Sequence, residues 1–186
     1  MDTSESESES QPSLSNDSEE GEQPPSAQGT TPVVGLVDVT KSLDEDTMAW
    51  LEEATRQLVM AMAEDGVEIG RVSARLIGDE EMGRAHLDYA GVEGTTDVLA
   101  FLACADPLEV DVLACVDEAQ RRAHEFGHEL QQEVMLYMVH AILHGLGHDD
   151  SDLDSSQRMY AEEARLLARI GVGPVLRSHD EKGASQ

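Results

Sequence analysis

The chain has few basic residues and no long apolar run. Its 12 lysines and arginines stand against 39 aspartates and glutamates, which gives a formal net charge of -27 over 186 residues. Because a surface this acidic repels nucleic acid, binding of RNA or DNA would require a local basic patch that outweighs the overall charge. The absence of an apolar run long enough to cross a bilayer argues against a membrane protein.

Cysteine is scarce as well. Cys104 and Cys115 are the two cysteines, and they do not have C-x-x-C spacing. Both lie in apolar stretches, so we expect buried free thiols rather than a disulfide. The first thirty residues are polar and acidic, unlike a signal peptide. We therefore expect a cytoplasmic protein.

The two ends differ in composition from the middle of the chain. The first 28 residues contain eight acidic residues and no basic one, and they pass from alternating Ser and Glu to a stretch rich in Pro, Ser and Gln. Such a segment cannot bury enough apolar surface to offset the entropy of ordering it. We predict a disordered acidic tail over 1–30, one domain over 31–175 and a frayed tail over 176–186.

Hydrophobic periodicity predicts four strands and about five helices in that domain. The expected strands cover 33–39, 67–77, 96–101 and 109–114, and the expected helices cover 43–63, 78–88, 116–126, 129–143 and 154–170. Ser42 is the expected N-cap of the first helix. Strands early in the chain and helices late in it predict an α+β fold, with helices packed on a mixed four-stranded sheet.

One segment has the spacing of metal ligands. It reads His140-Ala-Ile-Leu-His144-Gly-Leu-Gly-His148-Asp149-Asp150. Residues four apart on a helix share a face, so the imidazoles of His140 and His144 can both reach one ion at about 2.0–2.1 Å. The two glycines can end the helix in a tight turn that swings a third ligand back. Asp150 stands at the third position of the H-x-x-x-H-x-x-G-x-x-[H/D] pattern of zinc sites.

Other assignments within this segment stay open. A single histidine on an apolar face is usually a core residue with a hydrogen-bond partner, but two at this spacing favour a metal site. If the helix continued, His140, His144 and His148 would form one stripe, although each glycine costs about 1 kcal/mol in a helix interior. We therefore prefer Asp150 as the third ligand. His148 would then support the ligands or line the cleft, and Asp149 would orient an imidazole or cap the turn.

Peptidase chemistry is disfavoured by the residue that follows the first histidine. A metallopeptidase of the H-E-x-x-H type needs a glutamate there as general base, and this chain has Ala141. Glu125, Glu129 and Glu133 lie nearby in sequence, and we expect all three to be exposed surface charges.

The order of these parts resembles the YbeY family, which comprises bacterial metal-dependent proteins of ribosomal RNA maturation. The segment from His140 to Asp150 is similar to the family pattern H-G-x-L-H-L-x-G-x-D-H. Leu87-Asp-Tyr89 together with Thr96-Asp-Val-Leu-Ala-Phe101 resembles its L-N-x-x-Y-R-x-x-D-x-x-T-D-V-L-S-F-P stretch. Val110-Asp-Val-Leu-Ala-Cys115 resembles its G-D-I-V-I-S strand. The resemblance covers roughly residues 33–172.

This resemblance implies a four-stranded sheet with the metal site on a central helix. It implies one Zn²⁺ per chain, held by His140, His144 and Asp150 as the catalytic metal ligands. The implied activity is that of a single-strand-specific endoribonuclease in rRNA 3′-end maturation and ribosome quality control. The implied partners are rRNA and the small ribosomal subunit or its proteins, with neither membrane nor DNA involved.

Two departures from the family pattern affect this reading. The third family histidine falls on Asp150, whose oxygen makes a harder and more anionic site at which Mn or Mg would compete better with zinc. The family arginine after the tyrosine, expected to hold a phosphate, falls on Ala90, and Arg84 is a speculative substitute. The missing arginine and the acidic charge favour an alternative function, a catalytically impaired metal-binding factor of ribosome assembly.

Overall fold

The computed structural model describes residues 31–173 and 175, which form an α+β fold as predicted. The two predicted tails, 1–30 and 176–186, lie outside the described residues. The strands of the described part are β1 (Val33–Asp38), β2 (Ile69–Ile77), β3 (Val98–Ala105) and β4 (Leu108–Cys115). Its helices are α1 (Glu45–Glu64), α2 (Asp79–Ala90), α3 (Val116–Phe126), α4 (Leu130–Gly145) and α5 (Leu153–Arg169).

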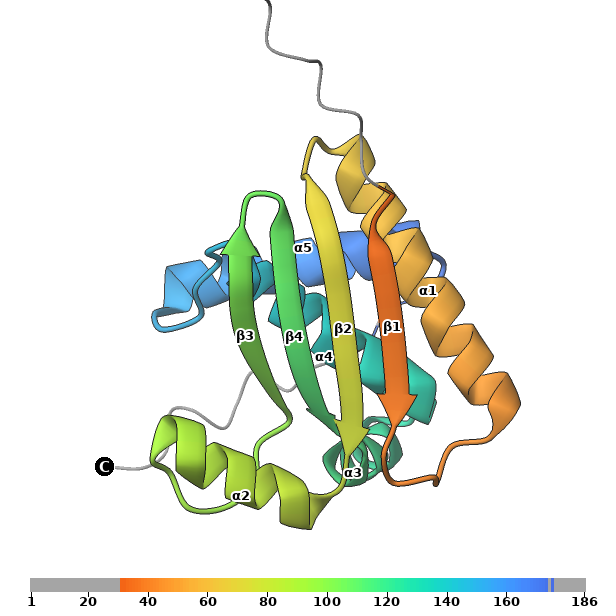
Figure 1. Cartoon of the computed structure of the whole chain (residues 1–186), viewed down its shortest axis with the longest axis vertical. Coiled ribbons are helices and arrows are strands. Elements are labelled where there is room, and N and C mark those ends of the chain that lie inside the picture. Colours follow the sequence, from red (N-terminus) through yellow and green to blue (C-terminus); the bar gives the residue numbers. More distant parts are fainter. Residues whose placement is uncertain (1–30, 174, 176–186) are drawn as a thin grey trace, which may run out of the picture.

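The four strands form one mixed sheet in the order β1-β2-β4-β3 (Figure 1). β2 pairs in parallel with both β1 and β4, and β3 pairs antiparallel with β4. The carboxyl ends of the three parallel strands therefore meet at one edge of the sheet. α3 begins at that edge directly after Cys115, the last residue of β4. This edge brings the start of α3 close to the start of β3.

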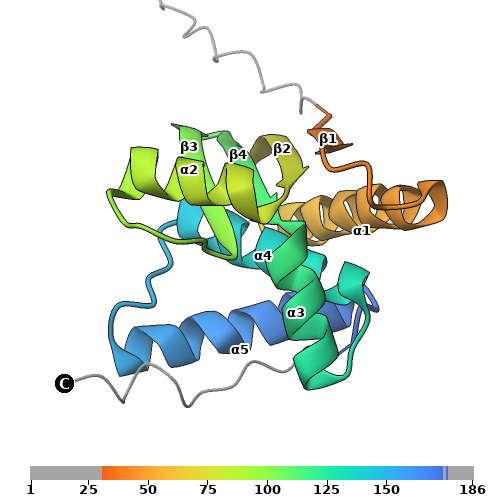
Figure 2. The same ribbon diagram turned by 90° about the horizontal axis from the view of Figure 1, so that it is seen from below.

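The helices α1 and α4 lie against one face of the sheet, and α5 lies on the far side of α4 (Figure 2). α4 is thus enclosed by neighbours on opposite sides. All of its residues from Glu133 to Leu143 are buried. This explains its sequence, since a helix that is apolar all round belongs in the interior. The central helix implied by the family resemblance is α4.

Several boundaries differ from the sequence-based expectation, most clearly those of α1 and β3. The N-cap of α1 is Asp44 and not Ser42, because the Asp44 carboxylate accepts a hydrogen bond from the Thr47 amide at 2.7 Å. β3 begins at Val98, where the Asp97 carboxylate accepts from the Val98 amide at 2.9 Å. β3 also extends to Ala105 because it pairs with β4 along this whole length, which the weakly patterned run after residue 101 did not indicate.

Both cysteines are free thiols, as predicted. Cys115 is fully buried, whereas Cys104 is only half-buried, contrary to the expectation of burial for both. Burial raises the pKa of the Cys115 thiol to about 11, so this thiol stays protonated near neutral pH. No helix among the described residues has the length and apolar character needed to cross a membrane.

Candidate metal centre

A cleft of about 580 Å³ lies beside the C-terminal half of α4. This volume falls within the range of about 300–1,000 Å³ that is usual for ligand sites. β3 and the loop before it, α3, α4, the turn after α4 and α5 all contribute to its walls. The lining residues are Thr95, Thr96, Asp97, Val98, Ala100, Glu118, Arg122, Phe126, Glu133, Tyr137, His140, Ala141, His144, Asp150 and Tyr160.

The structure brings the three predicted ligands together in this cleft. His140 and His144 lie one turn apart at the end of α4, with their Nε2 atoms 3.0 Å apart. The helix ends at Gly145, and Gly147 has φ +87°, a left-handed conformation that glycine adopts without strain. The chain then returns so that one ligand atom each of His140, His144 and Asp150 lies within 4.8 Å of the others. The predicted turn therefore forms as the glycines indicated.

The far side of each imidazole has its own partner. His140 Nδ1 lies 2.6 Å from Oε1 of Glu163 on α5, and both side chains are buried. His144 Nδ1 lies 3.0 Å from the backbone carbonyl oxygen of His148. A carbonyl oxygen only accepts, so His144 must donate through Nδ1, and the carboxylate of Glu163 assigns the same role to Nδ1 of His140. Both rings are held in the orientation that metal-bound histidines commonly have.

This arrangement of donors fits a cation. With Nδ1 of each ring directed at an acceptor, Nε2 of each neutral imidazole would be the atom that binds a metal ion, and these two Nε2 atoms lie 3.0 Å apart. With a carboxylate oxygen of Asp150 beside them, the three groups offer two nitrogen ligands and one oxygen ligand to a single point. Zinc accepts this set, and three protein ligands leave room for water or substrate, as in catalytic zinc sites.

His148 and Asp149 have supporting positions in the turn. The side chain of His148 lines a separate, smaller hollow beside Arg158 and not the main cleft, so its contribution to the centre is its backbone carbonyl. Asp149 accepts a hydrogen bond from the Ser151 amide at 3.1 Å and caps the turn. Since α4 ends at Gly145, His148 is not part of a three-histidine helical stripe.

The prediction that Glu133 is an exposed surface charge was wrong. Glu133 is 4% exposed and lines the cleft, and its carboxylate lies 2.5 Å from Nε2 of His128, whose side chain is 8% exposed. The sequence did contain a signal, because Glu133, Tyr137, His140 and His144 recur at helical spacing along one face of α4. The expectation assumed that this helix has a solvent side, and α4 has none in this region.

The Tyr137 hydroxyl is a second polar group of the cleft that the sequence analysis did not identify. It is buried and has no hydrogen-bond partner among the described residues. Burial, and then the nearby Glu133 carboxylate, raise the pKa of this phenol, so it remains a neutral donor. Buried polar groups are rarely left unpaired, and an oxygen of a bound substrate would satisfy this one.

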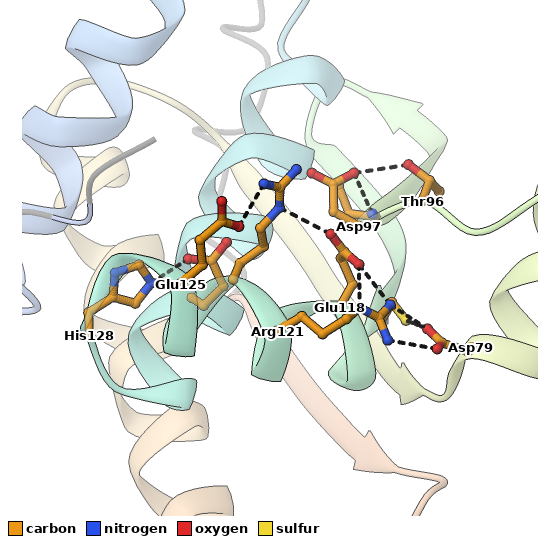
Figure 3. A network of polar contacts seen from close by, with 11 residues as sticks. Asp79, Thr96, Asp97, Glu118, Arg121, Glu125 and His128 are labelled. Atoms are coloured by element: carbon orange, nitrogen blue, oxygen red, sulfur yellow. Dashed lines mark hydrogen bonds and ion pairs between the residues drawn. The ribbon is translucent and has the colours of Figure 1, made fainter. Parts of the chain in front are cut away.

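Glu118 and Arg122 of α3 also line the cleft. Figure 3 shows the polar network to which Glu118 belongs. Glu118 accepts hydrogen bonds from Arg121, whose guanidinium also donates twice to Asp79 at 2.8 Å. The hydrogen bonds from Arg121 hold the pKa of the Asp79 carboxyl below its usual range. This network ties the start of α2 to α3 and orients Glu118. Arg84, in contrast, is an exposed residue of α2 that pairs with Glu80 and does not line the cleft.

We expect Glu163→Gln to weaken metal binding. The change removes the charge that His140 Nδ1 faces at 2.6 Å, and loss of such an outer partner commonly costs about 10–100-fold in metal affinity. A competition titration against a chromogenic chelator measures the change. Glu162→Gln is the matched control, because Glu162 pairs with Arg165 instead. Equal affinity in Glu163→Gln and wild type would show that the pair does not support the ion.

The chain is similar to known proteins of one family. Residues 37–171 match the model of the family described as endoribonuclease YbeY. The endoribonuclease YbeY of Bacillus licheniformis is 30% identical over 154 residues, covering 75% of this chain and 96% of the relative. That of Gloeobacter violaceus is 35% identical over 134 residues, covering 67% and 66%. The solution structure of TM1509 from Thermotoga maritima shares the fold, with a TM-score of 0.53 and 22% identity over 74% of this chain and 89% of that one.

Proposed function

Because this chain belongs to the endoribonuclease YbeY family, we propose that it is a metal-dependent endoribonuclease that cleaves single-stranded RNA. The observation that carries the proposal is the convergence of His140, His144 and Asp150 in the cleft. Relatives that bear the endoribonuclease name support the reaction class. The finer proposal is cleavage at rRNA 3′ ends in the cytoplasm, during maturation and quality control of the small ribosomal subunit.

The residues of this chain have distinct parts in the proposed reaction. His140, His144 and Asp150 would hold one divalent ion, which we propose to be Zn²⁺. A bound ion of this kind supplies Lewis-acid polarisation of a phosphoryl oxygen and lowers the pKa of water. Glu163 and the His148 carbonyl keep both imidazoles in the required tautomer. The buried Tyr137 hydroxyl offers a neutral hydrogen bond to an oxygen of the bound RNA.

The aspartate ligand bears on which metal is loaded. Asp150 adds a negative charge and a hard oxygen, so Mn²⁺ or Mg²⁺ would compete with zinc better here than at a site with three histidines. Elemental analysis of protein purified without added metal tests the choice of zinc, for which we expect about one atom per chain.

Metal removal and replacement test the proposed activity. We expect the chelated protein to leave a labelled single-stranded RNA intact and added Zn²⁺ to restore cleavage, because the proposed chemistry depends on the ion. Duplex RNA and single-stranded DNA of the same sequence are the control substrates and should remain uncut. Cleavage that persists in excess chelator would reveal a contaminating nuclease.

A second candidate function is supported by the alanine at position 90 and the strongly acidic charge. Without the family arginine, the protein would retain the fold and the metal but act as a non-catalytic factor of ribosome assembly. One bound metal per chain with no cleavage of any single-stranded RNA would favour this alternative. Activity that returns with the ion would exclude it.

A further inference from the structure

The lining of the candidate cleft carries several carboxylates, which would repel the phosphates of an RNA substrate. These carboxylates belong to Asp97, Glu118, Glu133 and Asp150. Among the described residues of the lining, Arg122 is the one arginine or lysine. The family position that would supply an arginine is Ala90, at the end of α2. Any side-chain cation for the RNA backbone in this cleft must therefore come from α3.

The guanidinium of Arg122 is held in place by its own helix. Nε donates to Glu118 at 3.1 Å, and Nη1 donates to Glu125 at 3.1 Å. The guanidinium carbon lies 5.9 Å from the centre of the Phe126 ring. These contacts come from residues four positions before and three and four positions after Arg122, the spacing at which helical side chains meet. The group is thus oriented before any ligand arrives.

The held guanidinium still has hydrogen-bonding capacity to offer. Nη2 donates to no residue of the described part of the chain, although a guanidinium has five N–H donors in a planar fork. The Arg122 side chain is 37% exposed, so this edge is accessible. Ion pairs at such an exposure are weak, and a phosphate can share the cation with Glu118 and Glu125. Arginine suits this task because its fork matches the geometry of phosphate oxygens.

The other arginines near α3 do not meet these conditions. Arg121 is engaged with Asp79 and Glu118 on the side of the helix that faces α2 (Figure 3). Arg84 is exposed and lies outside the lining of the cleft. Among the arginines and lysines that the structure describes, Arg122 is the one that shares the cleft with the proposed metal ligands.

We propose that Arg122 binds a backbone phosphate of the RNA and supplies from α3 the cation that position 90 lacks. This inference rests on the proposed function and names the residue that gives the acidic cleft its affinity for RNA. The phosphate would then share the cleft with the ion held by His140, His144 and Asp150. Arg122 would contact the RNA and would not be a ligand of the metal ion.

The test compares arginine variants that each remove one positive charge. Arg122→Gln keeps a long side chain on Phe126, and Arg84→Gln and Arg56→Gln are matched controls, the latter on α1 beside Glu52. Binding of a short single-stranded 2′-O-methyl oligouridine to each metal-loaded protein is measured over a range of salt concentrations. Each phosphate contact contributes about 0.7 to the slope of log affinity against log salt for single strands. We expect Arg122→Gln to lower that slope by about 0.7 and both controls to retain it.

Cleavage and a conservative variant complete the test. Cleavage of single-stranded RNA at subsaturating concentration should fall about 10- to 100-fold in Arg122→Gln, with the metal content unchanged, because a charge-assisted hydrogen bond to the substrate is lost. Arg122→Lys should keep the salt slope, since it keeps the charge, and recover part of the cleavage. The inference is overturned if Arg122→Gln keeps the wild-type slope, if Arg84→Gln loses it instead, or if wild type shows no salt-dependent binding. If Arg122→Gln lowers the slope but the wild-type protein never cleaves RNA, the inference is retained and the proposed activity is refuted.

Discussion

His144→Ala is expected to remove the bound metal and, with it, RNA cleavage. The Nε2 atom of this residue faces His140 at 3.0 Å, and its Nδ1 is already committed to the His148 carbonyl. Loss of a mere outer-shell partner costs about 10–100-fold in affinity, so loss of a direct ligand should exceed about 100-fold. We expect less than about a tenth of the wild-type metal by elemental analysis, and no cleavage of single-stranded RNA above the metal-free background.

A second histidine provides the control for this experiment. His148→Ala removes an imidazole only four residues away but leaves the backbone carbonyl that orients His144. It should therefore retain the metal, whereas Asp150→Ala should behave like His144→Ala. The opposite result, with metal lost from His148→Ala and kept by Asp150→Ala, would make His148 the third ligand. Unchanged metal in all three variants would place the ion elsewhere.

Ile142→Ala is expected to lower the free energy of unfolding more than any of the other substitutions proposed here. Ile142 lies on α4 between the two histidines, is fully buried and belongs to the main hydrophobic core. Truncating a buried isoleucine removes apolar contacts and leaves a cavity, which together cost about 2–5 kcal/mol. Whole domains have only about 5–15 kcal/mol of unfolding free energy. The midpoint of urea unfolding should fall accordingly.

Two further variants and the metal itself serve as controls. Ile142→Val should cost only about 0.5–1.5 kcal/mol, and Met60→Ala, at a site 65% exposed on α1, less than about 0.5 kcal/mol. Zinc at about 100 times its dissociation constant should restore about 2.7 kcal/mol to Ile142→Ala but nothing to His144→Ala. Equal unfolding midpoints for Ile142→Ala and Met60→Ala would contradict the packing described here.

The sequence predicted the parts of this protein that depend on neighbours along the chain. The spacing of His140 and His144 on one helix face, and the turn at Gly147 that returns Asp150, are local geometry. Each rests on a few consecutive backbone conformations. The fold class could likewise be inferred, because each strand and helix has its own hydrophobic period.

Groups that meet through tertiary packing could not be predicted in this way. Glu163 reaches His140 from α5, and Arg122 reaches the cleft from α3. Neither contact follows from spacing, since it depends on how far and at what angle two helices pack. Glu133 was misjudged for a related reason, because only the assembled layers show that α4 lacks a solvent side. Hydrophobic periodicity describes one helix at a time. The partner of a proposed metal ligand, such as Glu163 beside His140, lies on another helix.

The placement of the three proposed ligands has a mechanical consequence. Two of them are fixed at the end of α4, whose residues from Glu133 to Leu143 are buried, and the third lies on the short connection between α4 and α5. An ion bound to all three would cross-link this connection to the end of α4. Because the loop closed between His144 and Asp150 is short, little chain entropy is lost on closing it. Metal binding should therefore restrict the motion of the connection between α4 and α5 and leave the structure of the sheet unchanged.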